Sequence, residues 1–161
     1  MQNHKFLVKL NIDCVQEKFT LIDLKKSANM GFYDKVPDDG KGGWTDQGPS
    51  ADLAQISTGK QNVKGVPFEI IVPAENAGRS CLVLCNPEFR SYPSVQPVVC
   101  REKSGAFLYL LHASAWPGKP GSVTGKIEVR YADGSEETIP VKSAVDCGNW
   151  WRPTDLDNGQ T

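Results

Sequence analysis

The stretch Asp34–Pro49, DKVPDDGKGGWTDQGP, concentrates groups that could bind a ligand. Its four aspartates, Asp34, Asp38, Asp39 and Asp46, place hard carboxylate oxygens on an irregular, glycine-rich backbone, and Ca²⁺ prefers oxygen ligands of this kind. Their spacing differs from that of an EF-hand loop, which has a fixed glycine and a closing glutamate. The same aspartates could instead cap turns through hydrogen bonds to nearby backbone N–H groups. The sequence leaves both interpretations open.

The four tryptophans all lie outside the clearest strand-like segments. An indole ring can stack on the apolar face of a pyranose, while polar side chains bind the hydroxyl groups of the sugar. The predicted carbohydrate-binding residues are Trp44, Asp46, His112, Trp116, Arg130, Trp150 and Trp151. In the alternative interpretation, loop tryptophans fold back over the open end of a sandwich. That alternative suits Trp150 and Trp151 best, because adjacent residues of an extended chain point to opposite sides.

Catalytic chemistry has few candidates. His112 is the only histidine placed to act as a base, since His4 lies close to the N-terminus, and the sequence contains neither a GxSxG elbow nor a phosphate-binding GxxxxGK[ST] loop. Five cysteines without a CxxC pair, and only two histidines, argue against a zinc site. We therefore predict no catalytic residues and a protein that is not an enzyme.

Charge and hydropathy exclude further classes of partner. The net charge is −1 and neither sign forms a long run, so we expect no nucleic-acid partner and no binding to an anionic membrane surface. No apolar run approaches the roughly 20 residues that cross a bilayer. The start, MQNHKFLVKLNIDC, lacks the apolar region and cleavage site of a signal peptide.

Alternating apolar and polar residues dominate the elements that would position these groups. Strands are predicted over Lys5–Ile12, Phe19–Leu24, Val66–Val72, Cys81–Cys85, Val95–Arg101, Ala106–His112, Lys126–Tyr131 and Glu137–Val141. Asp133-Gly134 predicts a hairpin turn in which both residues have positive φ. Only Ser50–Ile56 could form one or two helical turns. About eight short strands predict an all-β protein, a sandwich or jelly roll, with residues 1–153 as one module and 154–161 as a polar, linker-like tail.

Several segments together resemble a known family. DLKKSANMGFYD, DGKGGWTDQGPSADL, GVPFEIIVP, LYLLHASAW, IEVRYADGSEETIPV and CGNWW are similar, in this order, to the galactose-binding-like β-sandwich module attached to bacterial glycoside hydrolases. The similarity runs from about Phe19 to Arg152, and DGKGGWTDQGP is its most specific part. Lys35 departs from the family pattern, in which an acidic residue often follows the aspartate at position 34. Cys147 also lies outside that pattern.

The resemblance implies a non-catalytic module that is secreted or periplasmic as part of a larger protein, with the catalytic domain of the same parent chain as a partner. Together with the loop tryptophans, it predicts a carbohydrate-binding module that targets its parent glycoside hydrolase to a polysaccharide. The alternative is a structural domain that braces the catalytic domain and buries Trp44. Structural Ca²⁺ is the one cofactor considered, on the four loop aspartates.

Overall fold

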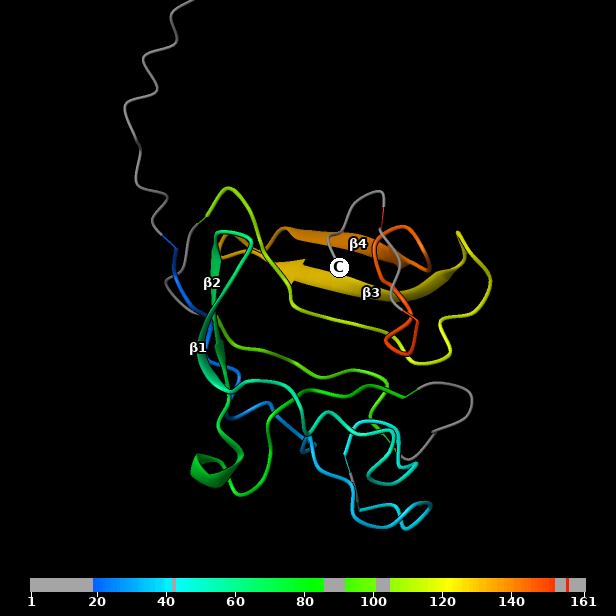
Figure 1. The fold of residues 1–161 in the computed structure, drawn as a ribbon. Coiled ribbons are helices and arrows are strands. Elements are labelled where there is room, and N and C mark those ends of the chain that lie inside the picture. The colour runs from blue at the N-terminus through cyan, green and yellow to red at the C-terminus, as the bar shows by residue number, and fades with distance from the viewer. Residues whose placement is uncertain (1–18, 42, 86–91, 101–104, 153–155, 157–161) are drawn as a thin grey trace, which may run out of the picture.

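The computed structural model describes residues 19–41, 43–85, 92–100, 105–152 and 156. Within these residues the regular structure consists of two small antiparallel sheets and one turn of 3₁₀ helix (Figure 1). Strands β1 (Gly59–Val63) and β2 (Val66–Ile70) form one sheet, and β3 (Val123–Arg130) and β4 (Glu136–Lys142) form the other. The helical turn, η1, covers Pro73–Glu75. This β-rich, mostly non-helical content fits an all-β class.

The β1–β2 hairpin is built by the tightest kind of turn. Val63 pairs with Val66, so Lys64 and Gly65 form a two-residue loop, and both have positive φ, of 50° and 92°. Such a loop matches the right-handed twist of the two strands. β2 was predicted by its alternating pattern, whereas β1, with the sequence GKQNV, has too few strand-forming residues to be recognised.

The β3–β4 hairpin confirms the predicted pair of strands. Ile127 and Val129 are half-buried on one face, and the charged residues between them are exposed. The predicted turn was wrong in detail, because only Gly134 has a positive φ, of 86°. The N–H of Gly134 donates to the carbonyl of Tyr131 (3.1 Å), and the N–H of Tyr131 donates to the carbonyl of Ser135 (2.9 Å). This is a three-residue loop that ends in a left-handed glycine.

The predicted jelly roll of about eight strands is not formed within the described residues. Phe19–Leu24, Cys81–Cys85 and Ala106–His112 form no ladder there, and only the isolated bridge between Met30 and Cys81 touches one of them. Residues 95–100 also form no strand, and Lys5–Ile12 lies outside the described residues. Alternation specifies which face of a strand is apolar, but it does not supply the partner strand that a ladder requires.

A turn-rich segment replaces the helical turns suggested for Ser50–Ile56. Ala51 N–H donates to Gly48 O (3.0 Å) and Ile56 N–H donates to Leu53 O (3.0 Å), so these residues form separate turns without a helix. The isolated i→i+3 bonds are not followed by the i→i+4 bonds that would propagate an α-helix.

The buried side chains gather around the loops and not between two large sheets. The buried apolar residues among those described are Ala28, Phe32, Ala51, Ile71, Val83 and Cys147. Five polar residues are buried with them: Asp34, Thr45, Asp46, Ser80 and Ser143. Three of the five belong to the stretch 34–49, so this loop is part of the core. No helix among the described residues is long and apolar enough to span a membrane.

Candidate functional site

The loop of residues 34–49 is held in place by hydrogen bonds at several points. Gly43 N–H donates to Tyr33 O (3.0 Å), and Asp38 N–H donates to Asp46 O (2.8 Å). The hydroxyl of Thr45, which is 1% exposed, donates to Ala51 O (3.0 Å). These bonds satisfy backbone groups that would otherwise be costly to bury, and they fix the position of Trp44.

A second group of backbone bonds joins the C-terminal segment to the chain near residue 114. Ser114 N–H donates to Gly148 O (3.1 Å), and Trp150 N–H donates to Ser114 O (3.2 Å). Ser114 and Asn149 form the corresponding isolated parallel bridge. Because Trp116 follows Ser114 by two residues, this pairing brings Trp116 close to Trp150 and Trp151.

Three tryptophans, Trp116, Trp150 and Trp151, line one cavity, which we call the tryptophan hollow. Its volume is about 440 Å³, and it is lined by Gln47, Ser50, Ala51, Trp116, Asn149, Trp150 and Trp151. Trp150 lies edge-on to Trp151, with ring centroids 5.2 Å apart, and Trp44 lies edge-on to Trp150 at 6.0 Å. Trp116 and Trp151 keep 43% and 58% of their surface exposed. The hollow is therefore open and has indole rings in its walls.

The adjacent tryptophans do not point to opposite sides, as an extended chain would require. Residues 150 and 151 lie in a turn, in which Trp151 N–H donates to Asn149 Oδ1 (3.0 Å). The turn lets both rings line the same hollow, while Trp44 packs against Trp150 without lining the hollow itself.

Three of the predicted sugar contacts lie away from the hollow. Asp46 is buried in the loop, His112 is only partly exposed and does not line the hollow, and Arg130 at the end of β3 pairs with Glu136 Oε1 at 2.6 Å. The polar side chains that do line it are Gln47, Ser50 and Asn149. Gln47 lies at the end of the loop, Ser50 directly follows the loop, and Asn149 precedes the tryptophan pair. Closeness to a tryptophan in the sequence was therefore the signal that could have identified these polar residues.

The electrostatics of His112 and Cys147, both of which are affected by the charge of Asp146, do not suit a base and a nucleophile. Burial lowers the pKa of His112, and the negative charge of Asp146 opposes that shift. Burial, followed by the charge of Asp146, raises the pKa of Cys147. Reactive cysteines have a lowered pKa, so the raised pKa of Cys147 argues against a nucleophilic role.

Three of the four loop aspartates converge. One carboxylate oxygen from each of Asp34, Asp39 and Asp46 lies within 4.8 Å of the others, whereas Asp38 is outside this group. The pKa of Tyr92 is raised, first by burial and then by the nearby carboxylates of Asp46 and Asp34. We call the three residues the aspartate cluster; among the predicted metal ligands, these are the ones the fold brings together.

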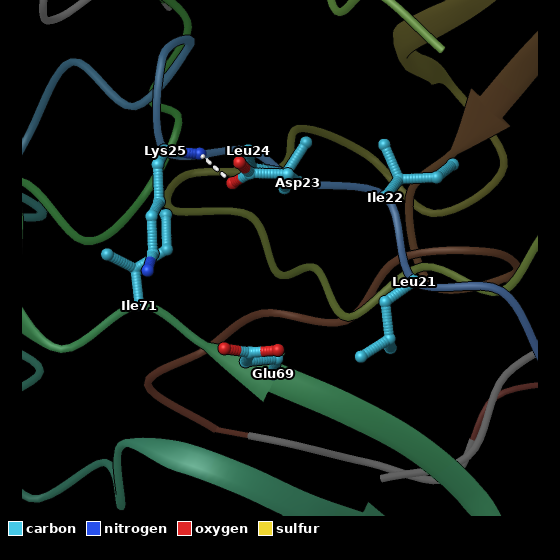
Figure 2. A pocket seen from close by; sticks show the side chains of 7 residues that line it. All are labelled: Leu21, Ile22, Asp23, Leu24, Lys25, Glu69 and Ile71. Atoms are coloured by element: carbon cyan, nitrogen blue, oxygen red, sulfur yellow. Dashed lines mark hydrogen bonds between the residues drawn. The ribbon is translucent and has the colours of Figure 1, made fainter. Parts of the chain in front are cut away.

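A second, smaller cavity of about 240 Å³ lies beside β2. Figure 2 shows the segment Leu21–Lys25 facing Glu69 and Ile71, with Lys25 N–H donating to Asp23 Oδ1 (2.8 Å). Its walls combine aliphatic residues with charged residues of both signs, and none of its lining residues is aromatic. It lacks a planar ring for a sugar to stack on, which makes the tryptophan hollow the better candidate for a ligand site.

Comparisons of this chain with protein-family models, with curated proteins and with solved structures give no match. Its function therefore has to be argued from the residues of the site.

Proposed function

We propose that this chain is a non-catalytic carbohydrate-binding module that holds a sugar in the tryptophan hollow. One observation carries the proposal: exposed Trp116 and Trp151 share one open cavity with the amides of Gln47 and Asn149 and the hydroxyl of Ser50. None of the residues lining the cavity is charged.

The chemistry of these groups suits a neutral polysaccharide. An indole face gives the C–H groups of a pyranose an apolar surface, and amide and hydroxyl groups both donate to and accept from sugar hydroxyls. A volume of about 440 Å³ lies in the range of small-molecule sites. The resemblance to the galactose-binding-like module supports the same role, with the module exported as part of a glycoside hydrolase and directing it to its polysaccharide.

The geometry around His112 supports a non-catalytic role. Cys147, which follows Asp146 in the chain, has a raised pKa, and His112 does not line the tryptophan hollow. A bound sugar would therefore meet no base or activated nucleophile from this pair.

Affinity electrophoresis of the whole chain against a panel of neutral polysaccharides tests the proposal. Retardation on at least one glycan is expected, and Trp116→Ala and Trp151→Ala should each weaken it about tenfold, since losing a stacking ring costs on the order of 1.5 kcal/mol. Phe107→Ala is the matched control, because Phe107 is 81% exposed and lies outside the hollow. Free migration on every glycan, or tryptophan variants that bind like the control, would overturn the proposal.

A bracing role is the second candidate, and it is favoured by apolar surface elsewhere on the molecule. Phe107, Val99 and Val95 are 81%, 71% and 66% exposed, and exposed apolar side chains can belong to a surface that another domain covers. In this role the catalytic domain of the parent chain covers these residues. Acrylamide quenching separates the two roles: quenchable tryptophans with glycan retardation favour binding, and shielded tryptophans without retardation favour bracing.

A further inference from the structure

We propose that Asp34, Asp39 and Asp46 bind a hard divalent cation of the Ca²⁺ type, and that the cation fixes the loop carrying Trp44. The cation site stands independently of the sugar. The consequence for sugar affinity rests on the proposed function of the tryptophan hollow.

The spacing of the aspartate cluster fits one ion. One oxygen from each of the three carboxylates lies within 4.8 Å of the other two. Oxygens that share a Ca²⁺ lie 2.3–2.6 Å from the ion, so any two of them are at most about 5 Å apart. A single ion can therefore contact all three side chains without a rearrangement of the backbone.

A buried carboxylate oxygen of Asp46 is the independent observation that points to a ligand in the aspartate cluster. Asp46 is only 8% exposed, yet its buried Oδ1 accepts no hydrogen bond within the described residues. A buried carboxylate oxygen without a partner is costly and rare. Asp34 is 2% exposed, and the ion pairs of the described residues involve only other carboxylates. A cation would compensate this buried negative charge.

One oxygen of each carboxylate in the cluster is already held by a backbone N–H group. Asp34 Oδ2 accepts from Gly48 N–H (2.7 Å), Asp46 Oδ2 accepts from Gly40 N–H (3.0 Å), and Asp39 Oδ1 accepts from Lys41 N–H (2.8 Å). Each carboxylate oxygen has a second lone pair that can face a cation. The backbone bonds hold the side chains in place, which lowers the entropic cost of binding.

The cluster is joined to the tryptophan hollow through the same loop. Asp46 lies two residues after Trp44, whose ring packs against Trp150 at 6.0 Å. Asp34 binds the N–H of Gly48, the neighbour of Gln47 in the wall of the hollow. A cation that draws the three carboxylates together would restrict both Trp44 and Gln47, and would stiffen this side of the hollow.

Terbium luminescence of the whole chain, excited through tryptophan, tests the cation site directly. Tb³⁺ should bind saturably and be displaced by Ca²⁺, and Asp46→Asn should weaken binding tenfold or more. Asp38→Asn is the matched control: Asp38 belongs to the same loop but not to the cluster, and asparagine tolerates its φ of 60°. Wild-type protein without saturable luminescence, or Asp46→Asn binding like Asp38→Asn, would disprove the site.

Folding of the variant is checked without metal. Asp46→Asn removes a buried charge, so in EDTA its urea midpoint should equal or exceed that of the wild type. If Asp46→Asn fails to fold, Asp39→Asn replaces it and the same tenfold loss is expected.

Tryptophan quenching by acrylamide then tests the link to the hollow without any sugar. Ca²⁺ should reduce quenching in the wild type and in Asp38→Asn, but not in Asp46→Asn. Unchanged quenching in a protein saturated with Tb³⁺ or Ca²⁺ would refute the link while leaving the cation site intact. Because no glycan is present in either assay, failure of sugar binding and failure of cation binding remain distinguishable.

Discussion

Gly43 is the position where the packing of the tryptophan-bearing loop can be tested most sharply. A Cβ added there would lie 2.9 Å from both the carbonyl carbon and the carbonyl oxygen of Phe32, and 3.0 Å from Gly31 O. All three are backbone atoms, which cannot turn aside as the end of a side chain can. Ordinary contact between carbon atoms begins near 3.5 Å, so Gly43→Ala forces the loop and the core around Phe32 apart by about 0.5 Å.

The expected cost follows from that displacement. Overpacking of one methyl group in a core costs about 1–3 kcal/mol, and replacing glycine recovers about 0.5–1 kcal/mol by restricting the unfolded chain. Phe32 is 5% exposed, so the strain falls on the core itself. A net loss of about 1–2 kcal/mol lowers the melting temperature of a chain of this length by roughly 2–8 °C.

Urea unfolding followed by tryptophan fluorescence measures the effect, with Gly125→Ala as the control. Gly125 lies in β3, and an added Cβ would meet nothing within 4 Å, so this substitution should be neutral or stabilising by up to about 1 kcal/mol. The midpoint of Gly43→Ala should fall clearly below that of Gly125→Ala. Equal midpoints would show that the backbone at Gly43 does not pack closely against Phe32.

Three further outcomes are expected. Thr45→Val should lower the free energy of unfolding by about 1–3 kcal/mol, because it leaves the buried carbonyl of Ala51 without its donor, whereas Thr45→Ser should restore most of the loss in the same urea assay. Burial lowers the pKa of His112 in the folded state below its usual value of about 6.5. As the pH falls from 7, the unfolded chain therefore takes up a proton on His112 before the folded protein does, and the free energy of unfolding decreases until the pH passes the lowered pKa. His112→Asn should therefore show a shallower fall in midpoint between pH 7 and pH 5, and parallel curves would contradict this reasoning. Burial also raises the pKa of Cys81 to about 12. An alkylating reagent at pH 8 should therefore label the exposed Cys100 first and Cys81 only after unfolding, which peptide mass spectrometry can measure. Equal labelling rates for the two thiols would contradict the burial of Cys81.

Strands that pair within a local hairpin could be predicted from the sequence, whereas the pairing of distant segments could not. The β3–β4 hairpin depends on alternating side chains and a glycine turn within about twenty residues, which is local information. The apolar segment Ala106–His112 alternates less clearly, and among the described residues it pairs with no neighbouring strand. Its residues Phe107 and Leu111 are exposed and form no ladder, because the pairing of distant segments is not determined by the pattern of either one.

The sequence alone indicated a β-rich chain, a glycine-rich loop that carries Trp44, and acidic residues suited to a hard cation. Only the tertiary structure decided which groups meet. Trp116 reaches Trp150 and Trp151 through the bonds between Ser114 and the C-terminal segment, and those partners are more than thirty residues apart in the chain.

The same holds for the adjacent aspartates of the loop. Asp38 and Asp39 have identical side chains, but only Asp39 lies in the cluster with Asp34 and Asp46, and Asp38 has a left-handed φ of 60°. The sequence shows which residues of the loop carry carboxylates. The direction in which a loop side chain points depends on backbone angles and hydrogen bonds that form only when distant segments pack together.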